Sequence, residues 1–315
     1  MAITKEASNS NHNVLPVRYK PSAREAFRQI IQQINFKENE FLLLPAYIGI
    51  TDKEGSGVFD PVRASGVKYD FYKINEKLEL DYSDIVKKVK EKKIKAILVI
   101  HYFSFFQVDI VKLKQLCDAE NIALIEDCAH AMNAYVESHK MIGSVGHYAF
   151  FSIHKYLPTK DGGFYTYTGT VTQGQDGSNG EEISHETLYI AHTADYNAIK
   201  TRRIANYNMM LSLLKSPGKK YSILHSNVPE GVVPLNFPVL IHNQNREKVY
   251  FKLIDKGVTV MSLYYRLIEQ IDRASFPLSY HISNSMLNFP IHQDIETKDI
   301  EYMSKVFLSV IDEME

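Results

Sequence analysis

Asp127 follows the run IALIE at 122–126, which predicts a buried strand ending at an acidic residue. A carboxylate in this position most often caps a turn or pairs with a nearby cation. In a cleft, however, a carboxylate can also pair with the nitrogen of a pyridine ring and keep that nitrogen protonated. The ring then withdraws electrons from a carbon attached to it. Asp127 is therefore a candidate partner for such a ring.

Lys155 lies among aromatic and apolar residues, between the run HYAFFSI at 147–153 and Tyr156-Leu157. Most loop lysines are solvated charges without a catalytic role. Apolar surroundings lower the pKa of an amine, and a neutral amine can attack an aldehyde to form an imine. Lys155 is therefore a candidate Schiff-base residue.

An anion site is suggested by Ser22 and Ala23, which precede and begin the apolar-periodic segment AREAFRQIIQQI at 23–34. Free amides and a hydroxyl at a helix start bind phosphate, although Ser22 could equally be a simple helix cap. Ser152, at the end of its own predicted strand, is a second candidate for the same anion.

The elements that must position these residues alternate in type between residues 41 and 168. Apolar runs at 41–45, 67–74, 95–102, 122–126, 147–153 and 164–168 predict strands, and helical patterns occupy 83–93 and 109–119. Continuous apolar strands separated by amphipathic helices indicate a mainly parallel sheet covered on both faces. Ligands of such sheets bind at the carboxyl ends of the strands, where Tyr102 and Asp127 fall. The Gly-rich stretch 49–66 reads as a loop.

The rest of the chain suggests a second, smaller unit. A polar stretch at 169–185 reads as a mobile loop, and a long helical pattern at 195–215 could bridge two domains. Beyond it, strands are expected at 233–241, 258–265 and 286–291, with helices at 245–257 and 298–314. We therefore expect a large domain at 1–194, with a loose first dozen residues, and a smaller C-terminal α/β domain that follows the bridging helix within 195–315.

Composition excludes several classes of protein. The 315 residues carry 36 basic and 37 acidic side chains, so the net charge of -1 gives no field that would attract nucleic acid. Hydrophobic residues make up 45% of the chain, yet the longest apolar runs are too short to span a membrane, and the polar N-terminus lacks a signal-peptide core. The two cysteines, Cys117 and Cys128, form neither a disulfide framework nor a metal motif, which favours the cytoplasm.

Two segments carry a family resemblance. LIEDCAHAMNAY at 124–135, followed by IGSVGHYAFFSIHKYLPTKDGGFYTY at 142–167, resembles the DegT/DnrJ/EryC1/StrS family of nucleotide-sugar aminotransferases. That family shows an Asp in E-D-x-A-[QH]-A, then a strand ending F-S-F, a lysine and an acid-Gly-Gly. Without a gap, the lysine eight residues before Gly163 is Lys155. LLLPAYIGIT at 42–51 and the C-terminal segment 283–303 are similar to other family motifs.

The resemblance implies the type I fold of enzymes that use pyridoxal phosphate (PLP). In that frame Lys155 would form the internal aldimine, Asp127 would pair with the pyridine nitrogen, and His130 would lie beside the cofactor. Ser152, with the helix start at Ser22-Ala23, would hold the phosphate.

The chain departs from the family pattern in three places. Where the family places a ring that stacks on the cofactor, four residues after the proline, this chain has Gly49, so stacking is expected from Tyr47, Tyr102 or another residue. The interval from Ser152 to Lys155 is about two residues short. The Gly-x-Asn-x-Arg segment, through which a neighbouring subunit helps to hold the phosphate, is not found.

The resemblance implies an aminotransferase that moves an amino group from a donor such as glutamate to a nucleotide-linked keto-sugar, acting as a cytoplasmic homodimer without a metal. Two alternatives stay open. One is a PLP-dependent sugar dehydratase, because some family members use histidine in place of the lysine and His154 adjoins Lys155. The other is a non-catalytic α/β module that keeps the fold.

Overall fold

The structure, a computed structural model, describes residues 15–106, 109–131, 135–136, 140–168, 183–214, 218–243 and 245–314. The first dozen residues, expected to be loose, lie outside these ranges, as does most of the stretch 169–185. None of the described helices is both long and apolar enough to cross a membrane.

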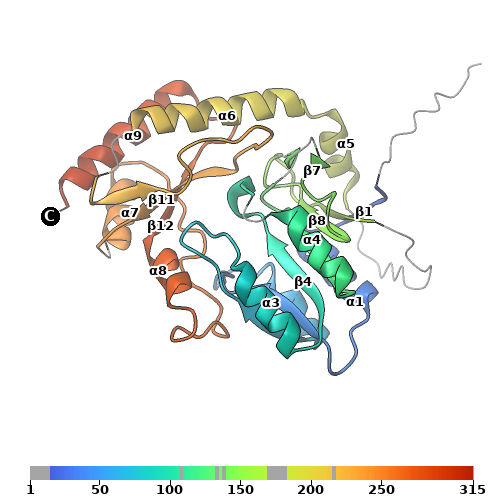
Figure 1. Cartoon of the computed structure of the whole chain (residues 1–315). Helices are drawn as coiled ribbons and strands as arrows, with labels where there is room; N and C mark the ends of the chain where they lie inside the picture. The colour runs from blue at the N-terminus through green and yellow to red at the C-terminus, as the bar shows by residue number, and fades with distance from the viewer. Residues whose placement is uncertain are drawn as a thin grey trace, which may run out of the picture.

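A seven-stranded sheet forms the centre of the N-terminal part of the chain (Figure 1). Its strand order is β1-β9-β8-β5-β4-β2-β3, and β3, β2, β4, β5 and β8 run parallel to one another. β9 runs antiparallel to both of its neighbours. The strands are β1 (Val17–Lys20), β2 (Phe41–Pro45), β3 (Lys68–Tyr72), β4 (Ile94–Ile100), β5 (Ala123–Asp127), β8 (Tyr148–Ser152) and β9 (Gly163–Tyr167). The expected mainly parallel sheet is therefore confirmed.

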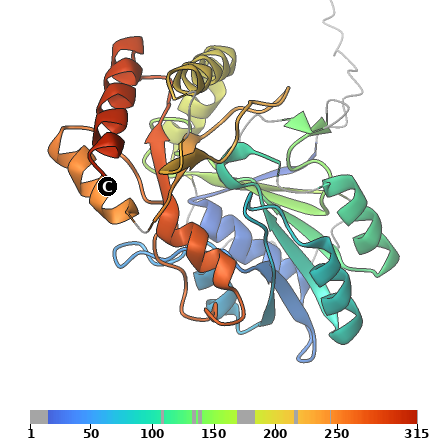
Figure 2. The ribbon, with the colours of Figure 1, turned by 60° about the vertical axis from the view of Figure 1, so that its left-hand side comes forward.

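Helices cover both faces of this sheet, as the sequence predicted. Figures 1 and 2 show α1 on one face, with α3 and α4 on the other. α1 is anchored to its face by stacking of Phe27 on Phe150, with ring centroids 4.8 Å apart. These helices are α1 (Ala23–Ile34), α3 (Tyr82–Glu91) and α4 (Ile110–Ala119), and a two-stranded ribbon, β6 (Tyr135–Val136) with β7 (Lys140–Met141), lies outside the sheet.

The expectation that 49–66 is entirely a loop is wrong, because α2 (Phe59–Ser65) lies within it. The Ser56 hydroxyl accepts from the amide of Phe59, and the Asp60 carboxylate accepts from the amide of Ser56. The helix ends at Gly66, whose φ of 68° lies in the left-handed region that favours glycine. The helix has only seven residues, and this is too short for the spacing of its apolar residues to predict a helix from the sequence.

The C-terminal part contains a three-stranded antiparallel sheet, β10-β11-β12, and a long helix, α6, that runs along the top of the molecule in Figure 1. The expected helix at 195–215 is confirmed by α6. These elements are α5 (His185–Thr193), α6 (Tyr196–Leu213), β10 (Tyr221–Ile223), β11 (Asn236–Ile241), α7 (Arg246–Asp255), α8 (Pro277–Ser285), β12 (Met286–Pro290) and α9 (Thr297–Asp312). Strand β10 and helices α5 and α8 were not anticipated.

The strand expected at 258–265 does not form. The segment makes a single bridge to the small sheet, between Met261 and Asn288, and then turns away. Tyr264 has a φ of 59°, a left-handed conformation that cannot continue a strand. The apolar residues Val258 and Val260 alternate with a polar residue in the sequence, which is the pattern of a strand, although this stretch leaves the sheet.

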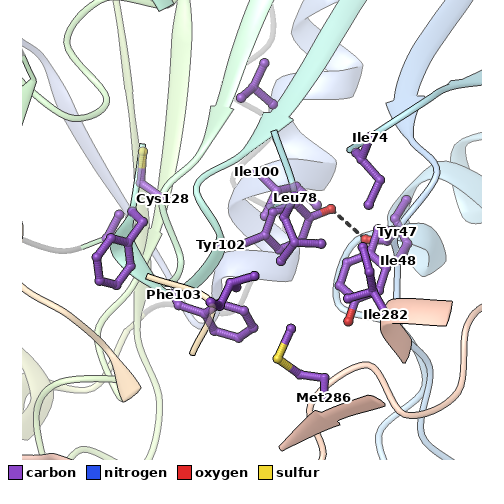
Figure 3. Packing of buried hydrophobic residues seen from close by; sticks show 14 of the residues in the cluster. Tyr47, Ile48, Ile74, Leu78, Ile100, Tyr102, Phe103, Cys128, Ile282 and Met286 are labelled. Carbon is purple, nitrogen blue, oxygen red and sulfur yellow. Dashed lines mark hydrogen bonds between the residues drawn. The ribbon is translucent and has the colours of Figure 1, made fainter. Parts of the chain in front are cut away.

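One apolar core joins the two sheets. Figure 3 shows Tyr47, which follows β2, and Tyr102, which follows β4, packed near Ile282 of α8 and Met286 of β12. The Tyr102 hydroxyl donates to the Tyr47 carbonyl oxygen at 2.6 Å. The C-terminal elements are thus packed against the carboxyl ends of the large sheet.

The closing Gly-Gly of the motif at 161–163 has a packing reason. A Cβ on Gly163 would lie 2.3 Å from the amide nitrogen of Ala23 and 2.4 Å from the carbonyl carbon of Ser22. The amide of Gly162 donates to the carbonyl of Pro21 at 2.7 Å. The first residue of β9 therefore touches the start of α1, so the motif sets the position of that helix start.

We expect Gly163→Ala to destabilise the protein by about 2 kcal/mol or more, because two backbone segments would have to move apart. Urea unfolding measures the effect. Gly218→Ala is the control, since a Cβ there meets nothing within 4 Å, and its cost should stay within about 0.5 kcal/mol. Equal losses for the two variants would contradict the packing argument.

Candidate active site

A cavity of about 390 Å³ opens at the carboxyl ends of β4, β5 and β8. Its walls come from the start of α1, the segment 48–58 and the C-terminal segment 262–265. Of the residues predicted from the sequence, the cavity is lined by Ser22, Ala23, Asp127, His130, Ser152 and Lys155. Six candidates from three separate stretches of sequence therefore meet in one place.

Lys155 follows the end of β8 and is half-buried. Burial lowers the pKa of its ammonium, while the carboxylates of Glu54 and Asp127 act in the opposite direction. A lowered pKa increases the fraction of neutral amine at a given pH, and this is the form that attacks a carbonyl. The neighbouring His154 also lines the cavity but is exposed.

Asp127 is the last residue of β5 and is 4% exposed. Its Oδ1 accepts from the amide of Ala129 at 2.9 Å, which orients the carboxylate. Burial raises its pKa to about 6, against the lowering effects of the Ala129 hydrogen bond and the charges of His101 and Lys155. A cationic ring nitrogen beside Asp127 would offset that burial and hold the carboxylate ionised.

His130 is neutral near pH 7, because burial and the charge of Lys155 lower its pKa to about 3. Its Nδ1 accepts from the amide of Phe103 at 3.3 Å, and this assigns the remaining proton to Nε2. The Phe103 ring is stacked on the imidazole with centroids 5.9 Å apart. His130 thus presents one hydrogen-bond donor on a ring of fixed orientation.

The start of α1 closes another part of the cavity. Ser22 is the N-cap, as predicted, and its hydroxyl accepts from the amide of Glu25 at 3.2 Å. The first amides of any helix lack partners within the helix, and together with the helix dipole they attract an anion. The hydroxyl of Ser152, a second lining residue, lies 3.3 Å from Nδ1 of His154. This end of the cavity is suited to a phosphate.

Glu126, next to Asp127, holds neighbouring parts of the backbone through buried hydrogen bonds. The side chains of Glu126 and His101 are fully buried, and His101 Nε2 lies 2.9 Å from the carboxylate. Each Glu126 oxygen accepts from two N–H groups, with the amides of Gly143, Val145 and Gly146 as the other donors. Although Cys128 brings a sulfur near this pair, a carboxylate with all four acceptor positions used is suited to holding the backbone rather than a metal.

Arg203 of α6 is 2% exposed and holds the segment around Lys155. Its guanidinium donates to the carbonyls of Leu235 at 2.8 Å and Lys155 at 3.5 Å, and lies 4.5 Å from the ring centroid of Tyr156. The Tyr156 hydroxyl donates in turn to the His130 carbonyl at 2.7 Å. Helix α6 is thus joined to two lining residues through their backbones.

Tyr47 and Tyr102, the expected stacking residues, are 0% and 1% exposed and do not belong to the lining of the cavity. Tyr264 and Glu54 do line it, and the sequence interpretation missed both. The only signal for Tyr264 was the glycine at position 49. Glu54 carried no local signal, because an isolated acid in a Gly-rich loop is usually solvated.

The fold and the cavity bring three groups together at the end of an α/β sheet. These groups are the amine of Lys155, the buried carboxylate of Asp127 and the start of α1. These groups fit the aldehyde, the ring nitrogen and the phosphate of PLP. Consistent with this, residues 56–170 match the DegT/DnrJ/EryC1/StrS aminotransferase family. The resemblance found in the sequence is therefore confirmed over this segment.

Individual relatives agree with the family match. A stretch of 90 residues is 34% identical to GDP-perosamine synthase of Vibrio cholerae, covering 28% of this chain but only 24% of the synthase. The aminotransferase TlmJ of Streptoalloteichus hindustanus superposes with a TM-score of 0.79 over 95% of this chain and 86% of its own, at 17% identity. The putative sugar aminotransferase Spr1654 of Streptococcus pneumoniae, in its PLP form, gives 0.76 over 95% and 88%, at 18% identity. The type I fold is therefore shown, and PLP is the cofactor of the family's aminotransferases.

The raised pKa of Asp127 predicts a pH-dependent stability for the cofactor-free protein. Between its ordinary pKa of 3.8 and about 6, the folded chain binds more protons than the unfolded chain, so this residue's contribution to stability falls as pH rises. Asp127→Asn removes that titration. We expect the free energy of unfolding of the variant, relative to that of the wild type, to rise by about 1 kcal/mol from about pH 5 to about pH 8. Urea unfolding at each pH measures this difference.

Asp272→Asn is the control for this experiment. The hydrogen bonds of Ser275 lower the pKa of Asp272, which is therefore ionised in both states across this range. The difference in free energy of unfolding between Asp272→Asn and the wild type should therefore not change with pH. If the stability difference between Asp127→Asn and the wild type also stayed the same at every pH, the burial argument would be contradicted.

Arg203→Met should destabilise the protein by about 2–4 kcal/mol, because several buried carbonyl oxygens would lose their donor. The neighbouring Arg202, which is half-buried and donates to a single carbonyl, that of Ile295, provides the matched control Arg202→Met. Chemical denaturation compares the two variants. Arg203 would lose its assigned role if Arg202→Met cost as much.

Proposed function

We propose that this protein is a PLP-dependent aminotransferase that moves an amino group, with glutamate as donor, to a nucleotide-linked keto-sugar. The meeting of Lys155, Asp127 and the start of α1 in one cavity is the observation that carries the proposal. The family match at 56–170 and the sugar aminotransferases among the structural relatives support the substrate class. The chain is further proposed to act in the cytoplasm as a homodimer, with its large and small domains divided before α6.

The six lining residues that the sequence predicted each have a role in this proposal. Asp127 would accept a hydrogen bond from the ring nitrogen, and His130 would donate one from Nε2. Ser152 and the first turn of α1, from Ser22 and Ala23, would bind the phosphate. Lys155 would attach the aldehyde covalently through Nζ.

When bound, PLP supplies a conjugated ring that accepts the electrons of a carbon–hydrogen bond in the substrate. Lys155, once its Nζ is released from the aldehyde, is the base that takes the proton from the substrate carbon and returns it at the neighbouring position. Its lowered pKa suits both directions of that transfer. Asp127 keeps the ring nitrogen protonated during the transfer, because a buried carboxylate favours a cationic partner.

Borohydride reduction of the protein loaded with PLP, followed by peptide mapping, tests the attachment. We expect one pyridoxyl group, on Lys155, and its loss in Lys155→Ala together with a fall in transamination of at least about 10³-fold. Lys160→Ala, five residues away and exposed, is the matched control and should keep the label. A label on another lysine would overturn the assignment.

Product analysis tests the reaction. Nitrogen transferred to the keto-sugar supports transamination, whereas loss of water without nitrogen would identify a dehydratase. A protein that takes up no PLP would contradict the proposal altogether.

A further inference from the structure

The cavity has few aromatic rings that could face a bound pyridine. Its lining includes Phe150, Tyr264 and Tyr265 besides the imidazole of His130. Phe150 is 2% exposed and its ring is stacked on Phe27 of α1, so it belongs to the core. Tyr265 is 43% exposed and lies toward solvent. Tyr264 is the remaining phenyl ring in the lining.

The Tyr264 ring occupies the space that a side chain at position 49 would need. A Cβ built on Gly49 would lie 2.8 Å from Cδ1 of Tyr264 and 3.1 Å from its Cα. Gly49 does not have a positive φ, so its backbone does not require glycine. The close approach of Tyr264 is therefore the reason for glycine at this position.

Tyr264 is held in an unfavourable backbone conformation. Its φ of 59° is uncommon for an aromatic residue and costs free energy, and such strain tends to persist where function uses it. The Ser283 hydroxyl donates to the Tyr264 carbonyl at 2.5 Å, which fixes the turn. Behind the ring, Tyr47 and Tyr102 pack with centroids 5.0 and 5.6 Å away.

The ring also lies near the groups assigned to the cofactor. Its centroid is 6.3 Å from that of His130. Burial, with the charge of Asp127, raises the pKa of the Tyr264 phenol above its ordinary value. The side chain consequently stays neutral at physiological pH and offers an uncharged aromatic face.

We propose that Tyr264, from the C-terminal part of the chain, is the aromatic residue against which the pyridine ring of the cofactor packs, with Gly49 as the space that admits it. This inference rests on the proposed use of PLP. Tyr47 and Tyr102 then act as positioning residues behind Tyr264. Cofactor affinity consequently depends on how the segment 261–265 is packed against the large sheet.

Titration of the cofactor-free protein with PLP, followed by visible absorbance and circular dichroism, tests this assignment. Tyr264→Ala and Tyr264→Leu should raise the dissociation constant about tenfold or more, as removal of an aromatic stacking partner does elsewhere. They should also weaken the circular dichroism band of the bound cofactor. Tyr264→Phe keeps the ring and should stay within about twofold of the wild type.

A swap variant separates stacking from general damage. In Gly49→Tyr/Tyr264→Ala the ring returns from the opposite chain segment, and we expect most of the lost affinity and dichroism to recover. Tyr189→Ala removes a tyrosine that is 71% exposed and does not line the cavity, and it should bind PLP like the wild type. Thermal melting of each cofactor-free variant verifies folding, and Tyr264→Leu keeps more of the apolar side-chain volume than the alanine variant if the latter is unstable.

The outcomes are distinguishable from failure of the proposed function. If the wild type does not bind PLP, the function proposal fails. If the wild type binds PLP and folded Tyr264→Leu binds it equally well with an unchanged dichroism band, Tyr264 is not the stacking residue. A Tyr264→Phe variant as weak as Tyr264→Leu would assign the effect to the hydroxyl and overturn the stacking role.

Discussion

The carboxylate of Glu126 is the interaction on which the site depends. An ionised group without solvent exposure is tolerated only when its oxygens are fully hydrogen-bonded, and here His101 and three backbone amides satisfy them. These donors come from the end of β4 and from the turn before β8. Glu126 therefore fixes three neighbouring parts of the sheet relative to one another, and Asp127 takes its position as the next residue of β5.

A second set of contacts joins the C-terminal part of the chain to that strand end. Arg203 holds the carbonyl of Lys155, and Tyr264 fills the space over Gly49. Both residues come from segments that follow the lysine by about fifty to a hundred positions in a sequence of 315 residues. Because these contacts are made by buried groups, the separation of the two sheets would disturb the site as well as the core.

Much of the candidate site could be read from the sequence. Short-range patterns placed Asp127, Ser152 and Lys155 at or just after strand ends, and the family resemblance added His130. The cap at Ser22 was likewise readable from local chemistry. The strand expected at 258–265 shows the limit, since alternation of apolar residues is equally compatible with a segment that leaves the sheet.

The sequence by itself determined the alternating α/β order of the large sheet and most of the residues with chemistry, because each of these depends on neighbours a few positions away. Only the tertiary structure decided which aromatic ring faces the cavity and how Gly163 meets Ser22. Those results depend on distances between segments far apart in the chain. Gly49 is an example, because the sequence gives no reason for a glycine there. The structure does give one, since Tyr264 occupies the space that a side chain at position 49 would need.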